Sequence, residues 1–298
     1  MTIRAGDTPP SIGRRLAAWL HARPRLQLRL LLAGPVAWIG LAYLGSLAIL
    51  LLNGFWAKDA FSGRVIPFEW SLDAFASLLG EEVYRTIAVR TIVVALLVTL
   101  TDIVLAFPIA YYMARVAAPW TRRFLVVAVL MPLWASYLVK IYAWRTILQG
   151  NGLLDSVLAP LGLDGPGLTA VTSSWLVLSY LWLPYMILPI YAGLERVPGS
   201  LIEASADLGA RSGTTFRRVI LPLVFPSVVA GSIFTFSLTL GDYIVPSLVS
   251  DAKFIGNVIY DNSALGNFPI AAAYAIVPIV IMVGYLVIAR RLGAFDSL

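Results

Sequence analysis

Two carboxylates lie inside long apolar stretches of the sequence, where a negative charge is costly. Asp102 follows about 15 residues of one such stretch, which places it near the middle of a membrane helix that rises about 1.5 Å per residue. A charge at that depth costs at least about 2.5 kcal/mol, so we expect Asp102 to face protein or a cavity. It would either attract a cation, pair with Lys140, or remain a neutral, hydrogen-bonded carboxyl.

The second carboxylate, Asp242, marks the end of another apolar stretch. It stands about 20 residues after Pro222, so a continuous helix would carry it about 30 Å from that proline, near the outer mouth of the membrane. Gly241, Tyr243 and Pro246 beside it predict a broken helix end that bears an aromatic ring. Asp242 is therefore predicted either to line a path for a cation or to cap a helix at the interface.

Aromatic side chains near the ends of the apolar stretches form a second group of candidates. Their ring faces attract cations, which would complement the two carboxylates in a route for a positively charged solute. Aromatic rings also gather at membrane interfaces, and that purely structural role remains open. The candidates are Trp134, Tyr137, Trp182 and Tyr185, with Tyr243 beside Asp242.

Other chemistries are excluded by residue type. The chain has no cysteine and a single histidine, His21, so it offers no thiolate nucleophile, disulfide or zinc site. Lys58, Lys140 and Lys253 are its only lysines, and each follows alanine or valine, which rules out the Gly-Lys-Ser/Thr loop that binds ATP phosphates. We therefore expect neither an enzyme nor a cofactor, and ATP hydrolysis would have to lie on another polypeptide.

Composition places these residues in a membrane protein. Of 298 residues, 59% are hydrophobic and only 13% are charged, against about 25% charged in a soluble domain. The formal net charge of +6 does not indicate nucleic acid, because the arginines stand between apolar runs. Six stretches are long enough to span a bilayer as helices, so the predicted fold is an all-α integral membrane protein. They cover residues 30–52, 87–114, 124–148, 171–194, 223–249 and 270–289.

The basic residues predict the orientation of these helices. Most Lys and Arg residues lie in segments 1–29, 115–123, 195–222 and 290–298, and segments of this kind face the cytoplasm. Both termini are therefore predicted to be cytoplasmic, in a multi-pass protein of the inner (plasma) membrane. The first segment is a basic amphipathic tail that would lie on anionic membrane lipid or bind a partner.

The longest cytoplasmic loop differs from an ordinary connection between two membrane helices. Ser200 and Glu203 have the spacing of a capping box, in which the serine begins a helix and the glutamate reaches back to the serine amide. Gly209 supplies the left-handed residue that ends this helix. Ser212 would cap a second helix that ends at Pro222. We expect a helix, a turn and a helix.

Two acids and a face of small residues indicate that the first of these helices docks on another surface. Glu203 and Asp207 stand four residues apart, where like charges cost roughly 0.2–0.5 kcal/mol in an isolated helix. A basic partner would offset that cost; the alternative is a solvated, acid-tipped loop helix. A second face would allow close approach of another backbone. It comprises Leu201, Ala204, Ser205 and Leu208.

Within this loop the residues follow a fixed order: Glu203-Ala204-Ser205, then Gly209, then Val219-Ile220-Leu221-Pro222. This order resembles the EAA loop of permease subunits in binding-protein-dependent ABC importers, whose pattern is Glu-Ala-Ala, glycine and Ile-x-Leu-Pro. Ser205 replaces the second alanine of the pattern and Val219 its isoleucine, and both replacements are similar in size to the residues they replace. The resemblance extends over roughly residues 87–290.

Motifs outside the loop carry a narrower resemblance. They are Pro132-Leu133-Trp134, Tyr142-Ala143-Trp144, Asn151-Gly152-Leu153-Leu154, Pro184-Tyr185, Leu188-Pro189-Ile190-Tyr191, Asp207-Leu208-Gly209-Ala210, Gly241-Asp242-Tyr243 and Ile255-Gly256-Asn257-Val258-Ile259. These motifs are similar to the spermidine/putrescine branch of the family. Lys140 stands where relatives often have arginine, and Asp242 where they have glutamate, so charge is kept but geometry differs.

The resemblance implies a type I ABC importer permease fold over residues 87–290, after a first membrane helix and outer loop in 30–86 and before a tail, 291–298. It implies four kinds of partner: a second permease chain, two cytoplasmic ATPase subunits, an extracytoplasmic solute-binding protein and membrane lipid. Such a chain would form half of the path for putrescine, spermidine or a related small cationic or amino-acid-like solute. The residues implied in ATPase coupling are Glu203, Ala204, Asp207, Gly209, Arg211 and Pro222.

Two other functions are compatible with the sequence. A gradient-driven secondary transporter or channel would use Asp102 and Lys140 to carry charge across the membrane. A membrane anchor without a transport role would use the loop only to recruit a partner.

Overall fold

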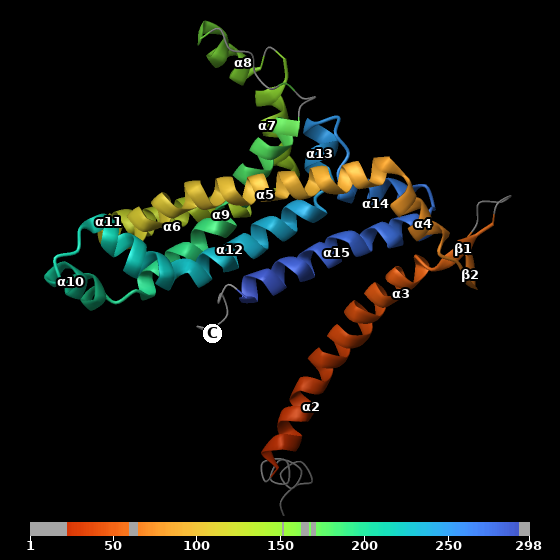
Figure 1. Cartoon of the computed structure of the whole chain (residues 1–298), viewed down its shortest axis with the longest axis horizontal. Helices are drawn as coiled ribbons and strands as arrows, with labels where there is room; N and C mark the ends of the chain where they lie inside the picture. The colour runs from red at the N-terminus through yellow and green to blue at the C-terminus, as the bar shows by residue number, and fades with distance from the viewer. Residues whose placement is uncertain (1–22, 60–64, 151, 162–166, 168–170, 292–298) are drawn as a thin grey trace, which may run out of the picture. The chain divides into compact units, whose positions relative to one another are not determined.

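The computed structural model describes residues 23–59, 65–150, 152–161, 167 and 171–291 (Figure 1). Most of the predicted basic tail and the predicted C-terminal tail, including His21, lie outside the described residues. The chain forms two compact units, residues 1–53 and 54–298. Each is described by itself.

The described part of the first unit, residues 23–53, is one long helical run. It consists of α2 (Pro24–Ala37), a wider π-helical stretch η1 (Trp38–Leu44) and α3 (Gly45–Asn53). Residues Gln27–Asn53 are apolar and long enough to cross a bilayer, as predicted for 30–52. None of the residues described in this unit is buried, so its apolar surface is left for lipid or for another protein.

The second unit is a helical bundle. Its longest helices are α5 (Glu82–Tyr111), α9 (Val171–Arg196), α12 (Leu221–Gly241) and α15 (Phe268–Arg291). The others are α4 (Asp73–Gly80), α6 (Pro119–Trp134), α7 (Tyr137–Leu148), α8 (Leu153–Leu158), η3 (Ala159–Leu161), α10 (Gly199–Asp207), α13 (Ile244–Val249) and α14 (Ile255–Ala264). A π-helical stretch η2 (Tyr112–Val116) extends α5, while α11 (Ser212–Thr215) and η4 (Phe216–Ile220) lead directly into α12.

The segment between the first two spans holds more structure than the loop predicted there. Strand β1 (Trp56–Lys58) pairs antiparallel with β2 (Val65–Trp70), and their register shifts between Trp56 and Ala57. Helix α4 follows and packs near the start of α15 (Figure 1). The hairpin and α4 therefore connect the first unit to the bundle.

The third predicted span, 124–148, is not one straight helix. Helices α6 and α7 meet at 93°, so they form either one broken span or a re-entrant pair, and α7 projects from the bundle (Figure 1). Ala135 and Ser136 between them have extended backbone conformations, and the Lys140 ammonium donates to the Pro132 carbonyl at 3.2 Å. The predicted span is therefore a bent pair of helices, and hydropathy alone did not indicate the break because it does not register a two-residue change of conformation. With this pair, the described part of the chain holds up to six spans.

Two predicted helix ends around α12 are also wrong. The second loop helix does not end at Pro222, because the helical run continues from Ser212 to Gly241. The wider π-helical turn of η4 precedes Pro222 and opens the hydrogen-bond ladder where proline cannot donate. The fifth span was predicted to reach Val249, but α12 ends at Gly241 because Asp242 is extended.

The predicted capping box does not form. Helix α10 begins at Gly199 with Pro198 as its N-cap, and no side chain caps it. Ser200 therefore lies inside the first turn, where its hydroxyl cannot take the N-cap position. The helix exists as predicted, but the extended proline defines its start.

Helices α5, α9 and α12 form the core of the bundle. Small residues set the close approach of α9 to α12. A Cβ on Gly193 would lie 2.2 Å from Ser227 Oγ and 2.6 Å from Ser227 Cβ, and one on Gly231 would lie 2.8 Å from Met186 Sδ. These distances are shorter than van der Waals contact, so larger residues cannot occupy either glycine position without a shift of the helices.

We predict that Gly193→Ala lowers the stability of the purified protein by about 1–3 kcal/mol, because overpacking forces α9 and α12 apart. Thermal unfolding in detergent measures this change. Gly284→Ala is the matched control, since nothing lies within 4 Å of its added Cβ. Removal of the obstructing side chain in Gly193→Ala/Ser227→Gly should restore stability; a double variant as unstable as the single one would contradict this explanation.

Candidate functional site

A pocket of about 310 Å³ lies where α12 ends, at the helix terminus remote from α10. The start of α7, the middle of α9 and the break between α12 and α13 form its walls. It brings together four residues that the sequence singled out separately: Tyr137, Trp182, Asp242 and Tyr243. We call it the aromatic pocket; Ser237, Leu238, Gly241 and Ile244 complete its lining.

Asp242 organises the break between α12 and α13. Its Oδ1 accepts hydrogen bonds from the amides of Ile244 at 2.9 Å and Val245 at 3.0 Å, so it caps the start of α13. The Tyr137 hydroxyl donates to its other oxygen. The predicted cap is confirmed, and the same buried carboxylate lines the pocket. Its role in a translocation path stays a prediction.

Aromatic rings surround this carboxylate in two groups. The rings of Tyr137 and Trp182 stack with centroids 5.9 Å apart, and Tyr185 meets Trp182 edge-on at 5.8 Å. On the other side, Tyr243 stacks on Tyr260 at 4.5 Å. Tyr185 therefore contacts the pocket lining through Trp182. Tyr260 supports the Tyr243 ring in the same way, and nothing in the sequence indicated this role.

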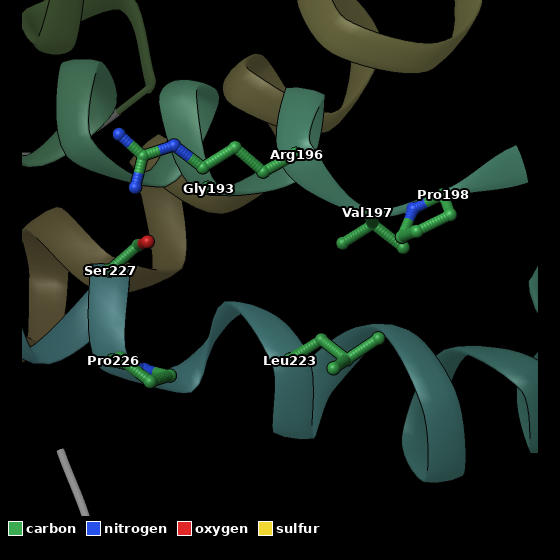
Figure 2. A pocket seen from close by; sticks show the side chains of 7 residues that line it. All are labelled: Gly193, Arg196, Val197, Pro198, Leu223, Pro226 and Ser227. Carbon is green, nitrogen blue, oxygen red and sulfur yellow. The ribbon is translucent and has the colours of Figure 1, made fainter. Parts of the chain in front are cut away.

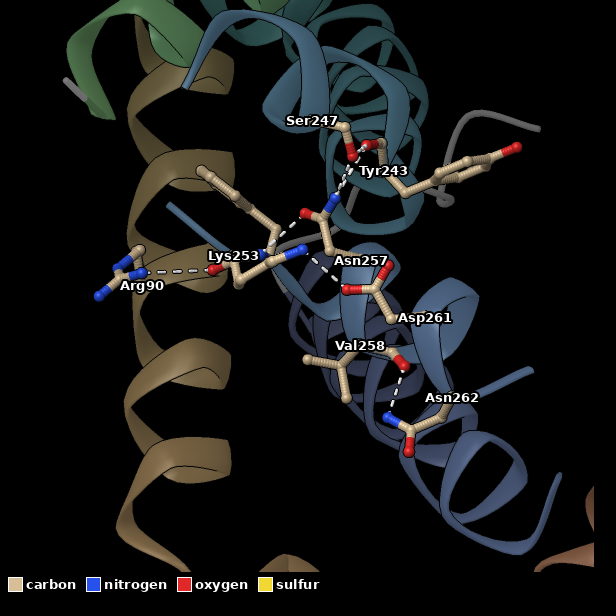
Figure 3. Close-up of polar contacts among 9 residues, drawn as sticks. Arg90, Tyr243, Ser247, Lys253, Asn257, Val258, Asp261 and Asn262 are labelled. Atoms are coloured by element: carbon tan, nitrogen blue, oxygen red, sulfur yellow. Dashed lines mark hydrogen bonds and ion pairs between the residues drawn. The ribbon is translucent and has the colours of Figure 1, made fainter. Parts of the chain in front are cut away.

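Helix α14 holds the broken segment in place, as Figure 3 shows. The buried Asn257 side chain donates to the Tyr243 carbonyl at 2.9 Å and to Ser247 Oγ at 2.7 Å, and it accepts from the Phe254 amide at 2.9 Å. The Asn257 side chain therefore ties the start of α14 to the start of α13, whose first carbonyl, that of Tyr243, also accepts from the amide and hydroxyl of Ser247. In the sequence, Asn257 was noted only as part of a motif shared with the spermidine/putrescine branch. The structure shows that its side chain holds the break between α12 and α13.

The first turn of α14 lies directly against the break. A Cβ on Gly256 would lie 2.8 Å from the Gly241 carbonyl oxygen and 2.9 Å from that of Asp242, so only glycine permits this contact. From α5, Thr91 Oγ1 accepts the amide of Ile255 at 3.1 Å. Helix α14 therefore packs directly on the backbone of the break that carries Asp242, and α5 holds the start of α14.

At the other end of α12, α10 presents an exposed surface. Glu203, Ala204 and Asp207 are exposed, and Leu208 is 89% exposed. The hydroxyls of Ser205 and Thr215, both buried, are 2.5 Å apart and join α10 to α11. The predicted stripe therefore does not pack as a unit, since only Ser205 faces the chain's own core.

The turn after α10 has the predicted geometry. Gly209 has φ of 74°, a left-handed conformation that glycine adopts without strain. Arg211 follows as the N-cap residue of α11 and is exposed, and Pro222 lies in the first turn of α12. The six residues predicted to couple to an ATPase thus flank one turn and the helix that leaves it. Their role in coupling to an ATPase stays a prediction.

A cavity of about 230 Å³ lies where α9 passes into this loop (Figure 2). Gly193, Arg196, Val197 and Pro198 form one wall, and Leu223, Pro226 and Ser227 on α12 form the other. The cavity therefore borders the close contact of Gly193 with Ser227, at the point where α9 and α12 diverge toward the loop.

Residues 103–295 match the family described as "binding-protein-dependent transport system inner membrane component". The match covers well over half of the 298 residues. This chain belongs to that family. It is a permease subunit of an ABC importer in the inner membrane.

Two relatives show how far the likeness of this permease extends. The inner membrane ABC transporter permease protein YdcU of Escherichia coli is 45% identical over 100% of this chain and 99% of that protein. The spermidine/putrescine transport system permease protein PotB of Salmonella typhimurium is 31% identical over 83% of this chain and 87% of that protein. The resemblance to the PotB branch is therefore confirmed, although YdcU is more similar.

Solved structures confirm the fold of the permease. A chain of the bacterial alginate ABC transporter, in complex with alginate pentasaccharide-bound periplasmic protein, has a TM-score of 0.68 and 21% identity over 92% of this chain and 97% of that one. A chain of the MetNI methionine ABC transporter has a TM-score of 0.56 and 15% identity over 70% and 94%. The predicted type I ABC importer permease fold is thus confirmed.

Four predicted path residues of the permease do not line the aromatic pocket: Tyr185, which contacts Trp182 of its lining, and Asp102, Lys140 and Trp134. Asp102 is fully buried, and both of its carboxylate oxygens lack a hydrogen-bond partner within the described residues. The predicted pairing with Lys140 is wrong, because the bend at the start of α7 directs that ammonium to the Pro132 carbonyl. Trp134 is 84% exposed at the end of α6.

We predict that Asn257→Ala lowers the thermal stability of the permease and reduces solute uptake, because the buried Phe254 amide loses its acceptor and the link from α14 to the Tyr243 carbonyl is lost. Loss of a buried hydrogen bond costs about 1–3 kcal/mol when a partner is left unsatisfied. Uptake by the reconstituted importer measures the effect. Asn262→Ala, on the same helix but away from the break, is the control (Figure 3). Equal loss in both variants would show that α14 only needs to be folded.

Proposed function

We propose that this permease forms half of the translocation path of an ATP-driven importer for polyamines, putrescine or spermidine, or for a related small cationic or amino-acid-like solute. The observation that carries the proposal is the aromatic pocket. There, Asp242 and the rings of Tyr137, Trp182 and Tyr243 converge on one space. A carboxylate and aromatic faces are the groups that replace water around an ammonium ion.

The size of the pocket supports a small, elongated solute. About 310 Å³ lies at the lower end of the range for ligand sites, so the pocket would take one end of a diamine rather than a bulky molecule. One carboxylate would balance one ammonium group, and a second charge would need the opposite half of the path. That half would come from a second, homologous or identical permease chain.

The names of several relatives support the same solute class. PotB of Salmonella typhimurium and of Escherichia coli are both spermidine/putrescine transport system permeases, at 31% and 30% identity to this chain. The name of YdcU, at 45%, states no solute. Polyamine transport in this chain therefore rests on the pocket together with the PotB relatives.

Coupling to ATP is proposed to occur through residues 200–222. Helix α10 exposes Glu203, Ala204 and Asp207, so a basic cleft of an ATPase subunit would find two carboxylates on one helix. Gly209, Arg211 and Pro222 complete the proposed coupling set. Two cytoplasmic ATPase subunits and an extracytoplasmic binding protein would complete the importer, with both termini of this chain in the cytoplasm.

This assignment leaves ATP hydrolysis to the partner subunits, since the chain has no phosphate-binding Gly-Lys-Ser/Thr sequence. The alternative, a secondary transporter that uses Asp102 and Lys140, has less support. The two side chains do not pair, and Asp102 is fully buried away from the aromatic pocket.

The carboxylate of the pocket is tested by Asp242→Asn. Asparagine still caps a helix, so α13 should remain folded while the negative charge is lost. We expect putrescine uptake to fall by at least about tenfold, the equivalent of 1.4 kcal/mol, since one ion pair contributes about this much or more at an effective dielectric constant of 20. Asp251→Asn removes an exposed charge elsewhere and should have little effect. Unchanged uptake in Asp242→Asn would remove the basis for a cationic solute.

The coupling loop is tested by Glu203→Ala, which removes an exposed acid without a change in the core. We expect the importer to assemble, while ATP-driven uptake and stimulation of ATPase activity by the loaded binding protein fall by at least about fivefold. Ser200→Ala, on the same helix, is the control. Normal uptake and stimulation in Glu203→Ala would exclude this helix as the coupling element.

A further inference from the structure

Two arginines join the inner ends of three helices just before α10 begins. Arg115, at the end of η2, donates through Nη2 to the carbonyl oxygens of Leu194 at 2.5 Å and Val197 at 2.6 Å. Leu194 lies in the last turn of α9, where its carbonyl also accepts a longer bond from the Val197 amide at 3.3 Å, and Val197 directly follows the helix. Carbonyls at a helix end lack the donor four residues on, so a cation with several donors suits them. Pro198 and α10 follow directly.

The second arginine, Arg122, lies in the first turns of α6. It donates through Nε to the Met113 carbonyl at 3.0 Å and through Nη2 to the Ala114 carbonyl at 2.9 Å. Its Nη1 lies 3.4 Å from Glu195 Oε1, and the Tyr191 hydroxyl donates to that same oxygen at 2.5 Å. Arg122 therefore connects α6 both to the end of η2 and to the last turns of α9.

We propose that Arg115 and Arg122 act as an arginine clamp, which makes the start of α6, the end of η2 and the last turn of α9 move as one body with α10. The proposal rests on the proposed function, in which an ATPase displaces α10. The clamp positions the path rather than contacting the solute. The clamp has five hydrogen bonds. Three of them join residues more than 70 positions apart in the sequence and so link α9 to η2 and α6. The other two, from Arg122 to the carbonyls of Met113 and Ala114, link α6 to the end of η2.

The clamp matters because the two walls of the aromatic pocket are connected to opposite ends of the loop that contains α10. One wall is connected to the end that follows α10, and the other to the end that precedes it. The wall that carries Asp242 ends the run Ser212–Gly241, which leaves the loop after α10. The wall that carries Tyr137 follows α6, a helix of 16 residues and about 24 Å, which starts at the clamp. Through the clamp, α6 would follow the α9 side of the loop. The Tyr137–Asp242 hydrogen bond spans both walls.

Hydrogen bonds of this number and length also stabilise a static bundle, so the test must detect motion. The chain has no cysteine, which allows spin labels to be placed at chosen pairs of sites. A first pair at Ser200 on α10 and Val127 on α6 reports whether these helices move together; both positions are exposed. A second pair at Val127 and Phe234 on α12, also exposed, reports whether the two walls move apart.

The measurement uses electron–electron resonance on the complete importer in nanodiscs, first without nucleotide and then trapped with ATP and vanadate. We expect the Ser200–Val127 distance to stay constant and the Val127–Phe234 distance to change. If the Ser200–Val127 distance changes with nucleotide while Arg115 and Arg122 are both present, the proposal is overturned. A Val127–Phe234 distance that stays constant would also overturn it.

Arg115→Gln removes the guanidinium from the clamp, and Arg123→Gln, for which the described residues show no hydrogen bond, is the matched control. We expect Arg115→Gln to make the Ser200–Val127 distance depend on nucleotide and to lower solute uptake per ATP hydrolysed by at least about fivefold. Arg115→Lys keeps a charged donor and should restore part of the coupling. A lower melting temperature with an unchanged distance and an unchanged uptake ratio would show a structural role only.

Failure of the clamp and failure of the proposed function give different results. If Glu203→Ala abolishes coupling while Arg115→Gln leaves the uptake ratio unchanged, the loop couples but the clamp does not transmit. If Glu203→Ala and Arg115→Gln both leave the ratio unchanged, the loop itself is not the coupling element. If Arg115→Gln does not assemble, the two label pairs on the otherwise unchanged chain still decide the question.

Discussion

Every interruption of a helix in a membrane leaves backbone groups that lipid cannot satisfy, and this constraint organises the permease. Polar side chains satisfy backbone groups at several of these interruptions in the bundle. Lys140 takes the Pro132 carbonyl near the end of α6, and Asp242 takes two amides at the start of α13. Asn257 takes a carbonyl at the same break, and Arg115 takes the last carbonyls of α9.

This arrangement places charge and function at the same points. The uninterrupted parts of α5, α9 and α12 contribute small and aliphatic residues to a close-packed core. Polar side chains that bond to backbone groups of another helix gather where helices end or bend, whereas Asp102 inside α5 is an exception without such a bond among the described residues. The aromatic pocket and the loop that holds α10 both lie at such points, joined by the run Ser212–Gly241. A displacement at one interruption therefore has a rigid element through which to reach the other.

The sequence predicted features that depend on local chain chemistry. Gly209 adopts the left-handed conformation that its place after a helix requires, and the apolar stretches are helices near the predicted limits. Ser200 was a false signal, because the capping pattern also occurs inside a helix that an extended proline has already begun. Asp102 and Lys140 have opposite charges and were predicted as a possible pair, but a bend of 93° before α7 directs the Lys140 ammonium to the Pro132 carbonyl.

The sequence by itself determined a helical membrane protein with a helix–turn–helix loop and the family to which it belongs, because hydropathy, glycine placement and motif spacing are properties of neighbouring residues. Only the tertiary structure decided that Tyr137, Trp182 and Asp242 share one pocket. It also decided that Arg115 holds the end of α9. These contacts join residues about 45 to 105 positions apart through the packing and bending of helices, which no local pattern encodes.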